Sequence, residues 1–207
     1  FSITMGANSD KVSLMFGLSH TEQDVVWAKN RPVTAFPRGP KYPNEGLGAG
    51  PWGEILPLDF SFDKVLNHTG GPLGDGVGQD SRNPANYHNV VGGAPIAADN
   101  FNTTRQMVFA MPTKLDTIFT KGELQLPYGM RFVTTAMYAQ RKGVSTTAGY
   151  PLSSTSQSKY PVYVDKDSYY NPYGNKVAGA GNGQDLFFYR RTIEVPRVTE
   201  NNSRTLH

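Results

Sequence analysis

The segment most suggestive of phosphate binding is residues 48–53, GAGPWG, whose glycines have the spacing G-x-G-x-x-G. In dinucleotide-binding proteins such a segment follows a strand and opens a helix whose N-terminus meets a pyrophosphate. No strand pattern precedes Gly48, and Pro51 with Trp52 does not open a helix of a βαβ unit. The sequence therefore predicts a glycine-rich loop here, and not a nucleotide site.

Two other glycine-rich segments carry aspartate, GDGVGQD at residues 74–80 and AGNGQDL at residues 180–186. Both are similar to the nonapeptide repeat that binds calcium through carbonyl and aspartate oxygens. That repeat needs stacked copies to complete its sites, and these two single copies differ from each other. We expect loop tips, with calcium binding in a loop as the alternative.

The residues with catalytic potential form no known constellation. His20, His68, His88 and His207 fall in no H-E-x-x-H spacing, and neither G-x-S-x-G nor G-K-[ST] occurs. The chain has no cysteine, which removes disulfides, thiolate nucleophiles and Cys-based metal sites. We expect a protein that is not an enzyme and that has no cofactor, no catalytic residues and no metal site.

A different chemistry, capture of a polar ligand, fits aromatic and arginine side chains in the Gly- and Pro-rich segments. Such side chains stack on a ligand or donate hydrogen bonds to it. The alternative for each of them is packing within its own loop. The candidate ligand-facing residues are Trp52, Tyr87, Tyr169, Tyr170, Arg190 and Arg191.

The elements that position these segments are β-hairpins, and the first hairpin spans residues 1–27. Residues 12–19 alternate strictly, with Val12, Leu14, Phe16 and Leu18 on one face. Eight residues at ~3.3 Å each, tilted by roughly 40°, project to about 20 Å, close to the apolar band of a membrane barrel. Residues 7–11 form the predicted turn.

The second predicted hairpin spans residues 114–141 and turns at Pro127-Tyr128-Gly129. Its apolar positions alternate with Lys121, Glu123 and Arg131, although Phe119 falls on the charged face. A water-filled barrel tolerates charges on its inner face, whereas the core of a β-sandwich does not.

Two very long connections follow these hairpins, at residues 28–113 and 142–202, and residues 203–207 begin a further strand. Connections in compact soluble domains rarely exceed about 15 residues. Short turns that alternate with very long loops are typical of an outer-membrane barrel, which has tight periplasmic turns and large extracellular loops. This asymmetry carries the prediction of the fold.

The composition agrees with an all-β chain. Of 207 residues, 22 are Gly, 15 are Pro and 12% are aromatic, which favours strands with long connections over a helical bundle. No apolar run is long enough for a transmembrane helix. The net charge is +3, and Lys and Arg are scattered instead of gathered in a stripe, so nucleic-acid binding is not expected.

The sequence resembles a middle segment of the barrel of a TonB-dependent outer-membrane receptor of the subgroup with very long extracellular loops. The resemblance covers nearly the whole chain except residues 37–95. The residues that carry it are VSLMFGLS at 12–19 leading to VWA at 26–28, the stretch 101–141, YNPYG at 170–174, and RRTIE at 190–194 with Pro196 and Arg197.

The resemblance implies an antiparallel transmembrane β-barrel of about 22 strands, of which this chain holds four to five. It also implies a Gram-negative outer membrane with lipid and lipopolysaccharide, extracellular loops, and active uptake of a siderophore-iron complex, cobalamin or an oligosaccharide. The further partners it implies are an N-terminal plug domain of the same parent chain and the TonB complex. We therefore expect an internal piece of a longer protein; the alternative is a secreted all-β binding or surface-layer module.

Overall fold

The computed structural model describes residues 1–154, 159–160, 162–177 and 183–207, so the predicted loop 180–186 lies partly outside the described residues. The prediction of an all-β chain is confirmed, because strands dominate and the helices are single 3₁₀ turns. None of the described helices has the length and apolarity needed to cross a membrane. Neither of the two five-stranded sheets closes on itself.

The chain forms two compact units. Unit 1 comprises Phe1–Val26, Val108–Thr146 and Val198–His207, and unit 2 comprises Trp27–Met107 and Thr147–Arg197. Most of both predicted long loops therefore lies in unit 2, which has a sheet and a core of its own. The two-stranded sheet of β3 (Val26–Trp27) and β7 (Val108–Ala110) is separate from both larger sheets.

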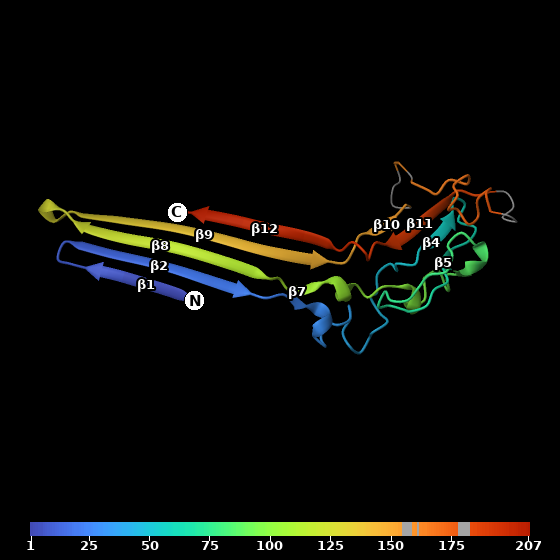
Figure 1. The fold of residues 1–207 in the computed structure, drawn as a ribbon, viewed down its shortest axis with the longest axis horizontal. Helices are drawn as coiled ribbons and strands as arrows, with labels where there is room; N and C mark the ends of the chain where they lie inside the picture. Colours follow the sequence, from blue (N-terminus) through green and yellow to red (C-terminus); the bar gives the residue numbers. More distant parts are fainter. Residues whose placement is uncertain (155–158, 161, 178–182) are drawn as a thin grey trace. The chain divides into compact units, whose positions relative to one another are not determined.

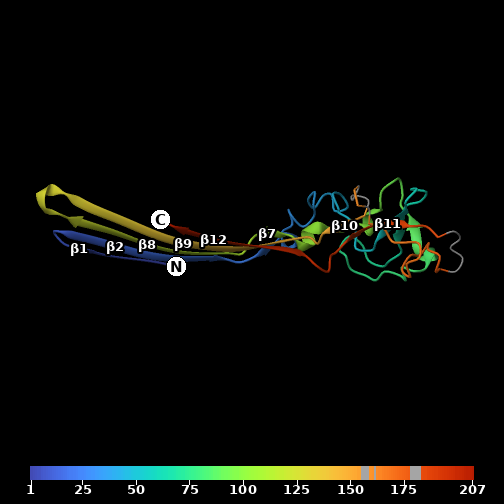
Figure 2. The same cartoon turned by 90° about the horizontal axis from the view of Figure 1, so that it is seen from above.

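The five-stranded sheet of unit 1 has the strand order β1-β2-β8-β9-β12. The strands lie side by side in Figure 1 and form a single thin layer in Figure 2. The bounds are β1 Ser2–Asn8, β2 Val12–Gln23, β8 Thr113–Gln125, β9 Arg131–Thr147 and β12 Arg197–Leu206. A 3₁₀ turn at Pro127–Gly129 joins β8 to β9, with Tyr128 in the left-handed region at φ 65°.

Two strand boundaries differ from the predicted ones. β9 continues to Thr147 instead of ending at 141, and β12 begins at Arg197 instead of near 203. The pairing of Gly143 with Thr113 shows that the backbone ladder of β8 and β9 extends past the apolar alternation. Each extension is mostly polar, with Val144 or Val198 as its one large apolar residue, so neither carries a period-two hydrophobic signal.

The pairing register places the apolar alternate residues of neighbouring strands on one face of unit 1. Leu18 pairs with Ile3 and with Ile118, and Leu124 pairs with Val12 and with Phe132. Directly paired residues share a face of a sheet. This apolar face carries Ile3, Met5, Val12, Leu14, Phe16, Leu18, Ile118, Leu124, Phe132 and Tyr138.

The apolar face is exposed, and it ends at a charged margin. Leu14 is 52% exposed and Phe132 is 56% exposed. At the margin, His20 contacts Asp116 at 2.6 Å, and the Lys114 ammonium contacts the Glu22 carboxylate at 2.6 Å. The band of apolar side chains is thus limited along the strands as well as confined to one face.

The opposite, polar face carries the charged side chains of the second hairpin. Glu123 lies 3.0 Å from the Lys121 ammonium and 3.6 Å from the Arg131 guanidinium. Phe119, a large aromatic residue on this face, pairs with Gly17, and its ring occupies the space that a Cβ of Gly17 would take. The absence of a side chain at position 17 therefore leaves room for the Phe119 ring. This contact explains why an aromatic residue lies on the polar face, which the alternation alone did not explain.

Unit 2 contains a sheet built from both long segments. Its strand order is β10-β11-β4-β5-β6, and Phe188 of β11 pairs with Ile55 of β4. Its core includes Leu186, Phe101 and Val65, which are at most 3% exposed. The bounds are β4 Glu54–Pro57, β5 Lys64–Leu66, β6 Tyr87–Asn89, β10 Pro151–Ser153 and β11 Leu186–Arg191, with 3₁₀ turns η1 Ala28–Asn30, η2 Pro84–Asn86, η3 Ala97–Asp99 and η4 Thr103–Gln106.

Candidate functional site

The candidate site is a cavity of about 320 Å³ in unit 2, lined by side chains from β4, β11 and η3. The lining of the cavity includes Gly48, Gly50, Glu54, Asp99, Tyr189 and Arg191. Small-molecule sites typically have volumes from about 300 Å³ upward, so the cavity has room for a small ligand.

The glycine-rich segment 48–53 forms part of the cavity wall. A Cβ on Gly50 would lie 1.7 Å from the Asp99 carbonyl oxygen, and a Cβ on Gly48 would lie 2.7 Å from Arg191 Nη2. The segment leads into strand β4 and not into a helix. Its glycines thus allow the chain to pass close to Asp99 and Arg191, and nothing here resembles a dinucleotide-binding turn.

Arg191, at the end of β11, is 8% exposed. Its Nε donates to the Ala49 carbonyl at 3.1 Å and its Nη1 donates to the Gly149 carbonyl at 2.8 Å. Among the described residues no carboxylate forms an ion pair with it. Burial lowers the pKa of Arg191, although not enough for an arginine to lose its charge at neutral pH.

Two carboxyl groups interact beside the cavity. Burial, together with the nearby Asp63 and Asp99 carboxylates, raises the pKa of Glu54 to about 7. Burial also raises the pKa of Asp63, whose Oδ1 is buried without another hydrogen-bond partner. The pair therefore holds a proton near neutral pH, because two adjacent carboxylates in a partly buried site repel each other.

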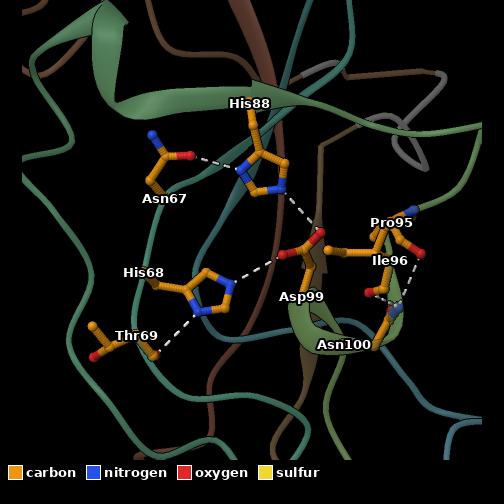
Figure 3. A network of polar contacts seen from close by, with 8 residues as sticks. All are labelled: Asn67, His68, Thr69, His88, Pro95, Ile96, Asp99 and Asn100. Atoms are coloured by element: carbon orange, nitrogen blue, oxygen red, sulfur yellow. Dashed lines mark hydrogen bonds and ion pairs between the residues drawn. The ribbon is translucent and has the colours of Figure 1, made fainter.

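Asp99 joins the cavity to a network with two histidines, shown in Figure 3. Its Oδ1 lies 3.1 Å from His68 Nε2, and its Oδ2 lies 3.1 Å from His88 Nε2. The other ring nitrogen of His68 faces the Thr69 carbonyl at 3.1 Å, and that of His88 faces Asn67 Oδ1 at 2.8 Å. Both ring nitrogens of His68 thus face oxygen atoms able to accept a hydrogen bond.

The network does not form a metal centre. No group of three His, Cys, Asp or Glu side chains within the described ranges is arranged to hold a metal ion. Asp99 and His68 side chains are both 3% exposed, and Trp52 stacks on His68 with ring centroids 4.1 Å apart. These contacts tie three segments of unit 2 together. Sequence reasoning missed the group of His68, His88 and Asp99 because these residues are far apart along the chain and form no local motif.

Two of the six predicted ligand-facing residues meet at a second pocket. Trp52 and Arg190 line it together with Gly74, Gly76 and Gly78 of the predicted loop 74–80. Arg190 also donates to the Pro51 carbonyl at 2.8 Å and pairs with Glu194 at 2.7 Å. Because successive residues of a strand point to opposite faces, Arg190 faces this pocket while Arg191 lines the cavity.

The predicted tyrosines lie away from the cavity. The Tyr87 hydroxyl donates to the Ser81 carbonyl at 2.8 Å, and burial raises the pKa of Tyr87 to about 12. Tyr169 and Tyr170 pack edge to face with ring centroids 5.2 Å apart, and the Arg82 guanidinium lies 3.8 Å from the Tyr169 ring centroid. The six candidates therefore do not converge on one site, and only Arg191 lies in the cavity.

Comparison of the chain with protein-family models, curated proteins and solved structures found no match.

Proposed function

We propose that this chain is part of a TonB-dependent outer-membrane transporter that takes up a scarce nutrient: a siderophore-iron complex, cobalamin or an oligosaccharide. Unit 1 supplies strands of the barrel wall, and unit 2 is the extracellular region that captures the ligand. The protein makes and breaks no covalent bond. Its partners are outer-membrane lipid and lipopolysaccharide, a plug domain of the same parent chain, and the TonB complex.

The observation that carries this proposal is the one-layer sheet of unit 1, with one exposed apolar face and one charged face. Within the described residues of unit 1, no second sheet or helix covers the apolar face. A soluble domain buries such a face against a second layer. Lipid on the apolar face and water on the charged face remove the need for that layer.

The strand lengths and the charged margin support the same proposal. β2 has 12 residues and β8 has 13 residues, more than the 9 to 11 or so that cross a bilayer with the usual tilt. The ion pairs His20–Asp116 and Glu22–Lys114 lie just beyond the apolar band, where a membrane surface would begin. In a secreted β-sandwich, the alternative, the apolar face would pack against a partner sheet of similar size.

The proposal is tested by the solubility of the full chain. Denatured protein is refolded by dilution with and without detergent micelles or lipid vesicles. We expect the chain to stay in solution only when an amphiphile is present, because the apolar face must be covered. The intact parent protein should show β-rich circular dichroism and heat-modifiable gel mobility, because its barrel is closed. A monodisperse, folded monomer of 22.7 kDa in detergent-free buffer would rule the transporter proposal out.

A further inference from the structure

We propose that the cavity binds a small organic carboxylate that also carries hydroxyl groups, with the Arg191 guanidinium as the partner of its carboxylate. The inference names a ligand class for unit 2 and rests on the proposed function, in which unit 2 captures the ligand. The hydrogen-bond partners of Arg191, the cavity wall and the charges around Glu54 support this ligand class.

Arg191 has binding capacity that the protein leaves unused. Its Nε and Nη1 donate to neutral carbonyl oxygens, and the described residues provide no acceptor for Nη2. Nη2 lies against Gly48, and both Arg191 and Gly48 line the cavity, so we place the carboxylate of the ligand at this edge of the guanidinium. A buried cation without a counter-ion is costly, and a planar carboxylate is the anion that best matches a guanidinium.

The rest of the wall suits hydroxyl groups better than a second charge. Near neutral pH the Glu54–Asp63 pair holds a proton, so Glu54 is able to donate or accept a hydrogen bond. Both carboxylate oxygens of Asp99 are already engaged by His68 and His88. The aromatic ring of Tyr189 lies on the same wall. A single cation, Arg191, among these uncharged or already hydrogen-bonded groups favours a ligand with one carboxylate and several hydroxyl groups.

Binding of the anion is expected to weaken as the pH rises. The titratable groups around Glu54 are Asp63 beside it, Asp99 on η3, and Tyr189 and Arg191 on β11. Above neutral pH Glu54 becomes an anion in the cavity and repels a bound carboxylate. Because Glu54 is mostly protonated at about pH 6 and mostly ionised at about pH 8, affinity should fall about tenfold between these values.

The test is isothermal titration calorimetry on the full chain in detergent micelles, with D-glucuronate as the probe and D-glucose as its neutral counterpart. We expect binding of glucuronate at about pH 6, at least about tenfold weaker binding of glucose, and the pH dependence given above. Glu54→Gln should lose the pH dependence, because its amide does not ionise. Arg191→Met should abolish binding, whereas Arg105→Met, which changes an exposed arginine of unit 2, should not.

Circular dichroism and hydrogen exchange report whether Arg191→Met remains folded, and the Glu54→Gln result does not depend on that variant. The inference is overturned if glucuronate fails to bind the wild-type chain, if glucose binds as well as glucuronate, or if Glu54→Gln keeps the pH dependence. The two proposals fail on different results. A detergent-free soluble monomer that binds glucuronate through Arg191 would refute the transporter proposal but not the carboxylate site. A chain that inserts into micelles and binds no carboxylate would refute the carboxylate site but not the transporter proposal.

Discussion

At the residue scale, Glu54 links protonation to the stability of unit 2. Its pKa of about 7 in the folded chain lies above the ordinary value of 4.5, so folding favours the protonated carboxyl. The stabilising contribution is fully present below about pH 4.5 and is lost as the pH rises through about 7.

We therefore expect the free energy of unfolding of unit 2 to fall between about pH 5 and about pH 8. Glu54 is only half buried and shares its proton with Asp63, so solvent screening reduces the expected loss to about 1 kcal/mol. Both tryptophans, Trp27 and Trp52, belong to unit 2, so urea unfolding followed by tryptophan fluorescence measures this change. Glu54→Gln should flatten the profile, and an unchanged profile would contradict the assignment.

Asp99 is the residue on which the buried polar network depends. Asp99→Ala would remove the acceptor of two histidines, one of them fully buried, and should destabilise unit 2 by about 2 to 4 kcal/mol. Asp99→Asn keeps one acceptor oxygen and should cost less. The exposed Asp75→Ala serves as the control in the same urea experiment, and equal losses for Asp99→Ala and Asp75→Ala would show that the network is not stabilising.

At the element scale, strand alternation predicted the faces of unit 1 but not the contact between Gly17 and Phe119. Alternation assigns each residue to a face because a strand has a period of two. The contact depends on the register between β2 and β8, which the sequence of either strand alone does not contain.

Gly17→Ala should destabilise the sheet by about 1 kcal/mol, because its methyl group displaces the Phe119 ring. In a Phe119→Ala background the same change should be nearly neutral. Gly143→Ala is the matched control, since its Cβ would lie 3.7 Å from its nearest neighbours. Denaturant unfolding of the four variants in micelles measures the coupling, and additive effects of the two changes would exclude the contact.

A second element-scale prediction compares the two faces of β2 at neighbouring positions. Leu14→Arg puts a charge into the apolar band and should destabilise the inserted sheet by about 2 to 4 kcal/mol if lipid covers that face. Ser13→Arg puts the same charge on the polar face, opposite Glu123, and should be tolerated. Heat-modifiable gel mobility of the intact parent protein after refolding into vesicles measures the difference, and equal effects would contradict a lipid-facing band.

At the scale of the whole molecule, segments far apart in the sequence complete one folded unit. β11 of the second long segment pairs with β4 of the first, and Leu186 is fully buried there. Asn171 of the YNPYG segment is also buried, and its side-chain amide donates to the Gln184 carbonyl at 2.7 Å. The two long segments therefore share one core and depend on each other for it. Two independent loops would not depend on each other in this way.

Replacing residues 150–195 by a short glycine-serine linker should accordingly abolish the amide-exchange protection of β4 and β5. Protection of β2 and β8 should persist, because their pairing lies within unit 1. A glycine-serine replacement of the exposed residues 40–46 provides the control. Hydrogen exchange measured by mass spectrometry resolves these segments, and protected β4 amides in the linker variant would contradict the shared core.

By itself the sequence determined the all-β class, the short turn at residues 127–129 and the faces taken by residues such as Leu14 and Lys121, because these follow from local periodicity and turn chemistry. Composition and motif spacing did not indicate that residues 28–113 and 142–202 contribute to one sheet. Only the tertiary structure decided that Arg191 meets Glu54 and Asp99 around a cavity. The physical reason is that β11 and β4 are far apart in the sequence, and that burial of a shared core determines their pairing and its register.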